Sequence, residues 1–448
     1  MIGMMHIVGF KVGLLGLGTV GAGTVQILQT PDQRHPLLQT LDIHRVGVRD
    51  LSKARTVELP MSVITTDLQA IVNDPEIDII VEVMGGIEPA KTLILQAIAN
   101  GKHIVTANKA LIANHSEEIF TAAEHHGVYV LLEAAVGGGI PVIEPLKQSL
   151  CANKIQRVMG IINGTTNYIL TRMVNEGADF AAVLADAQAL GYAEADPTAD
   201  VDGGDAADKI AILASLAFGG RIDRSKIPCE GIRGITASDI AYAEKLGFVI
   251  KLLGIAERSS NNSYSLRVHP TMLPKAHPLA SVQDVYNAIV VEGDPVGQVM
   301  FYGRGAGAGP TASAVTADLL NIAALLTVGR HGATHPDGKP MLDPLLACSH
   351  REYCTIAPPE DLRSSFYARF LTQDFPGVIG KLGTCFGDHQ VSLESIVQAG
   401  IKDGLAEIVV VTHEVREGDF RSALAEIETL PSISKVASVL RVLAGSAA

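Results

Sequence analysis

Acidic residues gather before a lysine in the stretch GYAEADPTADVDGGDAADK, at positions 191–209. Asp205 and Lys209 are four residues apart, so they would share one face of a helix. Carboxylates there could hold the ammonium group of a substrate while the lysine ammonium meets a carbonyl oxygen, which suits reduction of an amino-acid aldehyde. The acidic members are Glu194, Asp196, Asp200, Asp202, Asp205 and Asp208.

Two other interpretations of this stretch stay open. The spacing of Asp200, Asp202 and Gly203 resembles part of a calcium loop, although the glutamate that closes such a loop is missing. The stretch could also be a solvated acidic loop, in which Asp205 is the anion at the start of a helix.

A second lysine, Lys109, stands in the sequence VTANKAL directly after a predicted strand, His103–Thr106. Open α/β sheets bind ligands at the carboxyl ends of their strands. Lys109 is therefore a candidate catalytic residue, and the alternative is an ordinary surface lysine.

A glycine-rich loop follows the first predicted strand, Phe10–Leu15, and leads into a predicted helix, Gly21–Gln29. In the fingerprint G-x-G-x-x-G, Gly16 allows a tight turn, Gly18 lets a pyrophosphate approach the backbone, and Gly21 lets the helix pack on the strand. The loop predicts a dinucleotide site at the start of the helix. A glycine-rich turn without a ligand is the alternative.

The second strand of the sheet ends in Arg49 and Asp50. The guanidinium of Arg49 matches a 2′-phosphate, and Lys53 and Arg55 add positive charge nearby, so we expect NADP. NAD stays open, because Asp50 could bind the ribose hydroxyl instead. Arg49 could also be a solvated strand end.

The elements that position these residues alternate between strand and helix in the first third of the chain. Continuous apolar strands separated by helices predict a parallel sheet covered on both faces, as in a Rossmann fold. Besides the elements above, we expect strands at Ile43–Val48, Ile77–Val83 and Val128–Leu132, and helices at Leu68–Asn73, Pro89–Asn100 and Ser116–His126.

The rest of the chain predicts two further domains of an α/β protein. Residues 1–150 would form the Rossmann domain, 151–330 an α+β catalytic and dimerisation domain, 331–363 a linker, and 364–448 a ferredoxin-like βαββαβ domain. Within the second domain we expect helices at Phe180–Leu190, Asp205–Phe218 and Val315–Val328, the last packing on the first domain.

Composition limits the classes of partner. The 448 residues carry a formal charge of −13, which disfavours nucleic acid and anionic membranes. The five cysteines form no CxxC pair, which favours a reducing compartment, and we expect a cytoplasmic protein. We expect no membrane span, and the apolar start at 1–8 lacks the features of a signal peptide.

Taken together, the motifs resemble the homoserine dehydrogenase family, in its monofunctional form with a C-terminal ACT domain. The resemblance covers essentially the whole chain, and the acidic stretch is its most specific part. The motifs are the glycine loop, TANK at 106–109, EAAVGGGIP at 133–141, NGTTNYIL at 163–170, the acidic stretch, and GRGAGAGPTASAV at 303–315.

The resemblance implies an enzyme that interconverts L-aspartate 4-semialdehyde and L-homoserine in threonine, methionine and isoleucine synthesis. Lys209 would donate the proton to the carbonyl oxygen, with Lys109 as a second catalytic lysine. Glu194 and Asp205 would bind substrate, supported by Asp200. The cofactor would be lined by Leu17, Thr19, Val20, Arg49, Lys109 and Gly309.

The family also implies a bound monovalent cation, usually sodium. It would be held by Glu133 and the carbonyls of Val136, Gly138 and Ile140. A glycine loop can turn carbonyls inward, and hard cations prefer oxygen ligands. A plain glycine-rich hinge is the alternative.

The C-terminal domain resembles an ACT domain, which implies inhibition by L-threonine. Asp374 is expected to cap a helix that opens at Pro376, and Gly377 leaves room at the turn. A role in dimerisation alone is the alternative, and the enzyme would be a homodimer or homotetramer. Rival functions are a non-catalytic NADP-binding amino-acid sensor and another semialdehyde oxidoreductase.

Overall fold

The computed structural model describes residues 9–259, 263–328, 341–348, 350, 352–402 and 404–443. The chain divides into two compact units. Unit 1 comprises Met1–Val158, Asp208–Arg224 and Asn287–Cys354, and unit 2 comprises Met159–Ala207, Ser225–Tyr286 and Thr355–Ala448. The domain boundaries given above stay predictions, and residues 331–340, 349 and 351 of the predicted linker lie outside the described residues.

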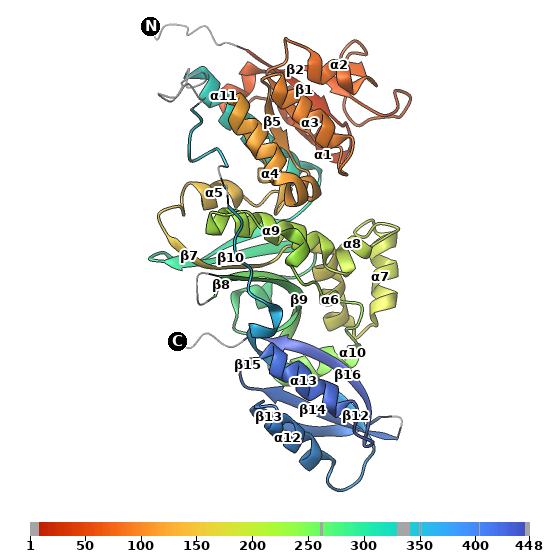
Figure 1. The fold of residues 1–448 in the computed structure, drawn as a ribbon. Helices are drawn as coiled ribbons and strands as arrows, with labels where there is room; N and C mark the ends of the chain where they lie inside the picture. The colour runs from red at the N-terminus through yellow and green to blue at the C-terminus, as the bar shows by residue number, and fades with distance from the viewer. Residues whose placement is uncertain are drawn as a thin grey trace. The chain divides into compact units, whose positions relative to one another are not determined.

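Unit 1 is built on a parallel sheet with the strand order β3-β2-β1-β4-β5-β6, which confirms the predicted Rossmann-like fold (Figure 1). The apolar strands are buried on both faces, as the sequence indicates. Strand β3 was not predicted, because two residues carry too little pattern. The strands are β1 (Phe10–Leu15), β2 (Leu41–Gly47), β3 (Ile64–Thr65), β4 (Ile79–Glu82), β5 (His103–Thr106) and β6 (Val130–Leu131).

Two helices of unit 1, α4 and α11, begin more than one turn earlier than predicted. Helix α4 begins at Lys109 and is interrupted at His115, where φ is −132°, so the predicted start at Ser116 marks this kink. Helix α11 begins at Ala308, because Pro310 is tolerated in a first turn. The helices are α1 (Thr19–Gln29), α2 (Leu68–Asn73), α3 (Ala90–Ala99), α4 (Lys109–His126), α5 (Ile143–Lys147) and α11 (Ala308–Thr327).

Helix α11 packs against the parallel sheet of unit 1, as expected. Its residues Val315, Leu319 and Ile322 are buried in one cluster with Val12 of β1 and Val25 of α1. By length and composition α11 could also cross a membrane, but 56% of its apolar stretch is buried inside the protein. We therefore interpret α11 as a core helix of unit 1.

A second sheet runs in the order β11-β10-β7-β8-β9-β16-β12-β14-β13, with β15 paired to β12. Its strands are β7 (Lys154–Ile161), β8 (Phe248–Arg258), β9 (Tyr264–Pro274), β10 (Tyr286–Asp294), β11 (Gly297–Arg304), β12 (Arg363–Thr372), β13 (Leu393–Lys402), β14 (Leu405–Thr412), β15 (Val415–Arg416) and β16 (Ile433–Val442). The α-helices between β7 and β8 along the chain are α6 (Gly164–Glu176), α7 (Phe180–Ala189), α8 (Thr198–Val201), α9 (Gly204–Phe218) and α10 (Ala237–Lys245).

The end of the chain forms the predicted βαββαβ unit from β12 to β16, with α12 (Val378–Asp388) and α13 (Glu417–Ile427). Phe366, Phe370, Phe386 and Phe420 form its core. The expected cap by Asp374 is wrong, because α12 begins after Gly377, which has a left-handed φ of 92° and no side chain to cap with. The Asp374 carboxylate instead accepts a hydrogen bond from Gln398 of β13 at 3.2 Å.

Candidate active site

The glycine loop has the conformation that its sequence indicates. Gly16 has a φ of 108°, and its N–H donates to Gly47 O at 3.0 Å. A Cβ on Gly21 would lie 2.2 Å from Gly16 O, so α1 contacts the loop at a distance that only glycine allows. A Cβ on Gly18 would meet nothing within 4 Å, so the backbone at the start of α1 is accessible to a ligand. Around it, Thr19 is exposed, and Leu17 and Val20 are half-buried.

Arg49 and Asp50, the two candidate ligands of the cofactor ribose, have different surroundings after β2. Arg49 is exposed. The Asp50 carboxylate accepts hydrogen bonds from Ser52 Oγ at 2.7 Å and Ser52 N at 2.8 Å, and these bonds lower the pKa of Asp50. The Arg55 guanidinium donates to the carbonyls of Asp50 and Lys53, so Arg55 stabilises the turn that follows β2.

The TANK motif presents Lys109 as the first residue of α4, directly beyond β5. Thr106 Oγ1 donates to Glu82 Oε2 at 2.7 Å, and Asn108 Oδ1 accepts from Leu111 N at 3.2 Å. Glu82 is fully buried, and burial raises the pKa of its carboxyl. We did not single out Glu82 from the sequence, although a charge at the end of the apolar strand IIVE is a signal that could have found it.

Helix α9 carries both key residues of the acidic stretch. Asp205 lies in its first turn and Lys209 one turn later. Both are buried, with 7% and 9% of their surface exposed. Buried ionisable residues gathered on one helix are candidates for function.

The structure sorts the other carboxylates of the stretch by partner. Asp200 and Asp205 both accept hydrogen bonds from the side chain of Asn163, at 2.7 and 2.9 Å. Asp202 pairs with Arg233 at 2.6 Å, and Asp208 pairs with Arg224 at 2.7 Å. Asp196 accepts from Thr198 N, and Glu194 is exposed. The structure thus brings together Asp200 and Asp205 among the predicted substrate ligands.

Glu133 has a structural role that the sequence did not indicate. Its buried carboxylate accepts hydrogen bonds from the N–H groups of Val142, Ile143 and Glu144 at 2.7–2.9 Å, at the start of α5. Its own N–H donates to Asp318 Oδ2 at 2.8 Å. Burial raises the pKa of Glu133, while the three backbone donors lower it.

Two glycine-rich segments, 137–139 and 303–309, lie against each other within unit 1. Gly138 has a φ of 55°, and a Cβ there would lie 2.4 Å from Gly305 O. Val136 and Ile140 are buried on either side of it. Gly309 is the second residue of α11, and a Cβ on Gly23 of α1 would lie 2.8 Å from the neighbouring Ala308 O. These glycines therefore permit close packing.

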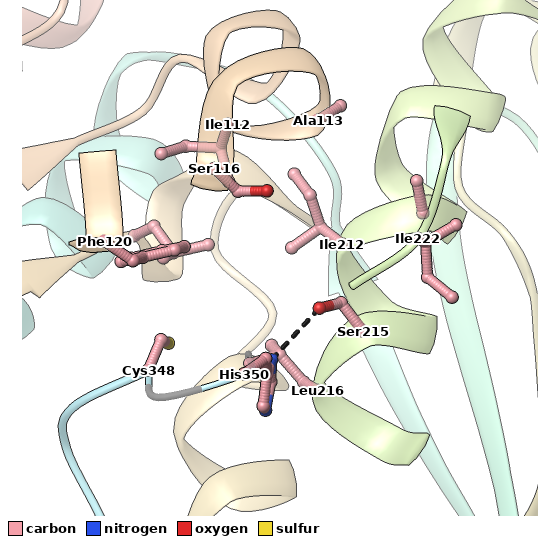
Figure 2. Close-up of a pocket in the computed structure, with 12 residues that line it drawn as sticks. Ile112, Ala113, Ser116, Phe120, Ile212, Ser215, Leu216, Ile222, Cys348 and His350 are labelled. Carbon is pink, nitrogen blue, oxygen red and sulfur yellow. Dashed lines mark hydrogen bonds between the residues drawn. The ribbon is translucent and has the colours of Figure 1, made fainter. Parts of the chain in front are cut away.

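A small pocket lies between α4 and α9 (Figure 2). Ile112, Ser116 and Phe120 line it from α4, and Ile212 and Ser215 from α9. Ser215 Oγ lies 3.1 Å from His350 Nδ1, and burial lowers the pKa of His350. None of these residues was predicted to be functional.

Comparisons with known proteins agree along the length of the chain. Residues 16–133 match the family model of the homoserine dehydrogenase NAD binding domain, residues 141–320 that of homoserine dehydrogenase, and residues 366–432 that of the ACT domain. Homoserine dehydrogenase of Synechocystis sp. is 64% identical over 436 residues, which cover 97% of this chain and 99% of the relative. That of Bacillus subtilis is 41% identical over 436 residues, covering 96% and 98%.

Solved structures give the same result. A homoserine dehydrogenase from Thiobacillus denitrificans has a TM-score of 0.89 at 42% identity, covering 97% of this chain and 98% of that one. A hyperthermophilic archaeal homoserine dehydrogenase in complex with NADPH has a TM-score of 0.61 at 26% identity, covering 71% and 98%. On these matches and on the fold, the chain belongs to the homoserine dehydrogenase family.

Proposed function

We propose that the chain interconverts L-aspartate 4-semialdehyde and L-homoserine in the synthesis of threonine, methionine and isoleucine, with Lys209 as the proton donor during reduction. The observation that carries this proposal is the burial of Asp205 and Lys209 one turn apart on α9. Asp205, Asp200 and Glu194 would bind the substrate, and Lys109 would act as a second catalytic lysine.

The proposed roles of these residues follow from the charge that develops on the substrate's carbonyl oxygen during reduction. A nicotinamide cofactor held by the glycine loop would supply the hydride to the substrate carbon in reduction and accept it in oxidation. During reduction negative charge builds on the carbonyl oxygen, and a Lys209 ammonium within ~3 Å stabilises this charge and donates the proton. The Asp200 and Asp205 carboxylates hold the ammonium of the substrate, so that the aldehyde has one orientation toward Lys209.

A steady-state assay of L-homoserine oxidation, followed by the absorbance of the reduced cofactor, tests the proposal. We expect turnover with L-homoserine that is lost in Lys109→Ala and Lys209→Ala. Binding of the cofactor without turnover of L-homoserine would support the amino-acid sensor instead. Faster turnover of a different semialdehyde would support another oxidoreductase.

We propose NADP as the preferred cofactor. Gly16, Gly18 and Gly21 would receive the pyrophosphate, while Arg49 would bind the 2′-phosphate. In support, the Asp50 carboxylate is already bonded to Ser52. Replacing Arg49 by alanine should raise the KM for NADPH by about tenfold and leave that for NADH nearly unchanged, since a charged hydrogen bond is worth about 1.5–3 kcal/mol. Equal effects on both cofactors would count against recognition of the 2′-phosphate by Arg49.

We propose that a monovalent cation, sodium by preference, binds at Glu133 and the carbonyls of Val136, Gly138 and Ile140. The donor set fits a hard cation, because it consists of oxygen atoms only. Three hydrogen bonds occupy the Glu133 carboxylate, whose acceptor capacity is about four. The apparent melting temperature should rise with sodium chloride relative to choline chloride, and an equal response to both salts would contradict the site.

The ACT domain supports an amino-acid effector, and we propose L-threonine as a feedback inhibitor. An open pocket of about 810 Å³ lies at the start of α12, where Asp374, Pro376, Gln398 and Ile408 contribute to its lining. The Asp374 carboxylate would attract the effector's ammonium. Titration of activity with L-threonine should show inhibition, and a flat response would leave the domain a role in dimerisation alone.

We also propose that the protein is cytoplasmic and forms a homodimer or a homotetramer. Sedimentation analysis would distinguish the dimer from the tetramer.

A further inference from the structure

Asn163 has a place in unit 2 that its sequence position does not reveal. It precedes α6 as the N-cap residue, and only 4% of its surface is exposed. Its side chain makes four hydrogen bonds, two as donor and two as acceptor. The amide nitrogen donates to Asp200 and Asp205, which are 37 and 42 residues away in sequence. The amide oxygen accepts from Thr166, three residues away.

The acceptor side fixes the orientation of the amide. Asn163 Oδ1 accepts from Thr166 N at 2.8 Å and from Thr166 Oγ1 at 2.9 Å. An amide turned by 180° would aim its N–H groups at the backbone N–H of Thr166, which has no acceptor to offer. The cap on α6 therefore obliges the amide nitrogen to face the opposite way.

The donor side of the same amide meets two carboxylates. Asn163 Nδ2 donates to Asp200 Oδ1 at 2.7 Å and to Asp205 Oδ2 at 2.9 Å. The two N–H bonds of an amide diverge by about 120°, so the two carboxylate oxygens lie roughly 5 Å apart. An ammonium group can bridge oxygens at this separation with two hydrogen bonds of ordinary length.

Resting on the function proposed above, we infer that Asn163 is a positioning residue, which holds the Asp200 and Asp205 carboxylates side by side as one binding site for the substrate's ammonium group. Two carboxylates this close repel each other, and donors shared between them offset the repulsion. The Asn163 amide does so as a neutral group. Aspartate could cap α6 but would repel both carboxylates, and serine could cap it but has one donor.

The test compares three substitutions in the full-length enzyme. Asn163→Asp keeps the shape and the α6 cap while it removes both donors. We expect the KM for L-homoserine to rise by about 10- to 100-fold, the range of a lost hydrogen bond to a charged group, with an unchanged KM for NADP. Asn163→Ser, which retains one donor, should give a smaller rise. Thr166→Val disturbs only the acceptor side of the cap and should leave the KM for L-homoserine within about twofold.

A rise in the KM for L-homoserine that is equal in Asn163→Asp and Thr166→Val would overturn the inference, because it would make Asn163 a helix cap alone. An unchanged KM in Asn163→Asp would also overturn it. If Asn163→Asp fails to fold, the ratio of Asn163→Ser to Thr166→Val decides in the same way. Asp205→Asn separates this inference from the proposed function: if it leaves the KM for L-homoserine unchanged, the substrate role of the acidic pair itself is wrong.

Discussion

Two clusters of charged residues in unit 2 use similar side chains for different purposes. At the ACT sheet, Arg369 donates to Asp239 Oδ1 at 2.9 Å and to Glu407 Oε1 at 2.8 Å, and Tyr242 OH donates to Glu407 Oε2 at 2.6 Å. At the acidic stretch, Asn163 donates to Asp200 and Asp205. One cluster is organised by a guanidinium and the other by a neutral amide.

The difference shows how the fold assigns a role to a carboxylate. The Arg369 cation compensates the charges of Asp239 and Glu407 within the protein, and all three residues are at most 6% exposed. Such a network ties α10 to β12 and β14 and favours one arrangement of these elements. The Asn163 amide organises two carboxylates without adding a positive charge of its own, which suits a site proposed to receive a cationic substrate group.

The comparison predicts its largest effect at Lys209. Lys209→Ala removes the group that donates the proton during reduction and accepts it from the hydroxyl during oxidation, so kcat for L-homoserine oxidation should fall by about 10²- to 10⁴-fold. Binding of NADPH, measured by fluorescence, should be unchanged. Near-normal turnover would remove Lys209 from the mechanism and α9 from the substrate site.

Arg369 should matter for stability and little for chemistry. Arg369→Met leaves Asp239 and Glu407 buried without their cation, which should lower the free energy of unfolding by about 3–5 kcal/mol. Arg363→Met is the matched control, since the ion pair of Arg363 with Glu414 is exposed, and it should cost less than about 1 kcal/mol. Urea denaturation measures both. A large loss of kcat in Arg369→Met with unchanged stability would contradict the division of roles.

Lys251 sharpens the comparison, because its partners are carbonyl oxygens. Its ammonium donates to Asn167 Oδ1 at 2.9 Å and to Val282 O at 2.5 Å, and burial lowers its pKa to about 8. The unfolded chain, with a value near 10.5, binds the proton more tightly. Stability should therefore increase as pH rises from about 8 to 10.5, by up to a few kcal/mol.

The measurement is the urea midpoint between pH 7.5 and 10 for the wild type and Lys251→Met. The wild type should gain stability with rising pH relative to the variant, whose residue 251 carries no titratable group. Parallel pH dependences of the two proteins would show that Lys251 does not titrate in this range.

The smallest effect is expected at Asp202. It lies between Asp200 and Asp205 in sequence, but its exposed carboxylate pairs with Arg233. Asp202→Asn should change stability by less than about 1 kcal/mol and leave the KM for L-homoserine unaltered. A KM raised as far as in Asp205→Asn would mean that the whole acidic stretch binds substrate without distinction.

Much of the fold could be predicted because local pattern decides it. The bounds of β1, α2 and β5 agree with the sequence-based ranges, since their apolar residues have a clear period and clear ends. The starts of α4 and α11 could not be placed. His115 interrupts the first helix, and the second begins inside a segment rich in glycine, which resembles a loop.

In the candidate site, too, the residues of local motifs could be predicted, and those that depend on distant partners could not. The glycine loop is a local motif, and the conformations of Gly16 and Gly21 agree with the roles given to them. Asn163, Glu82 and the cap role of Glu133 depend on partners that the fold brings near, so spacing alone could not identify them. Asp374 failed as a cap because Gly377 redirects the chain before α12 begins.

A crystal structure of the enzyme with L-homoserine and oxidised cofactor tests the central claim most directly. We predict the substrate ammonium within ~3 Å of the Asp200 and Asp205 carboxylates and the substrate hydroxyl within ~3 Å of Lys209 Nζ. L-homoserine bound with its hydroxyl away from Lys209, or with its ammonium on other residues, would contradict the account.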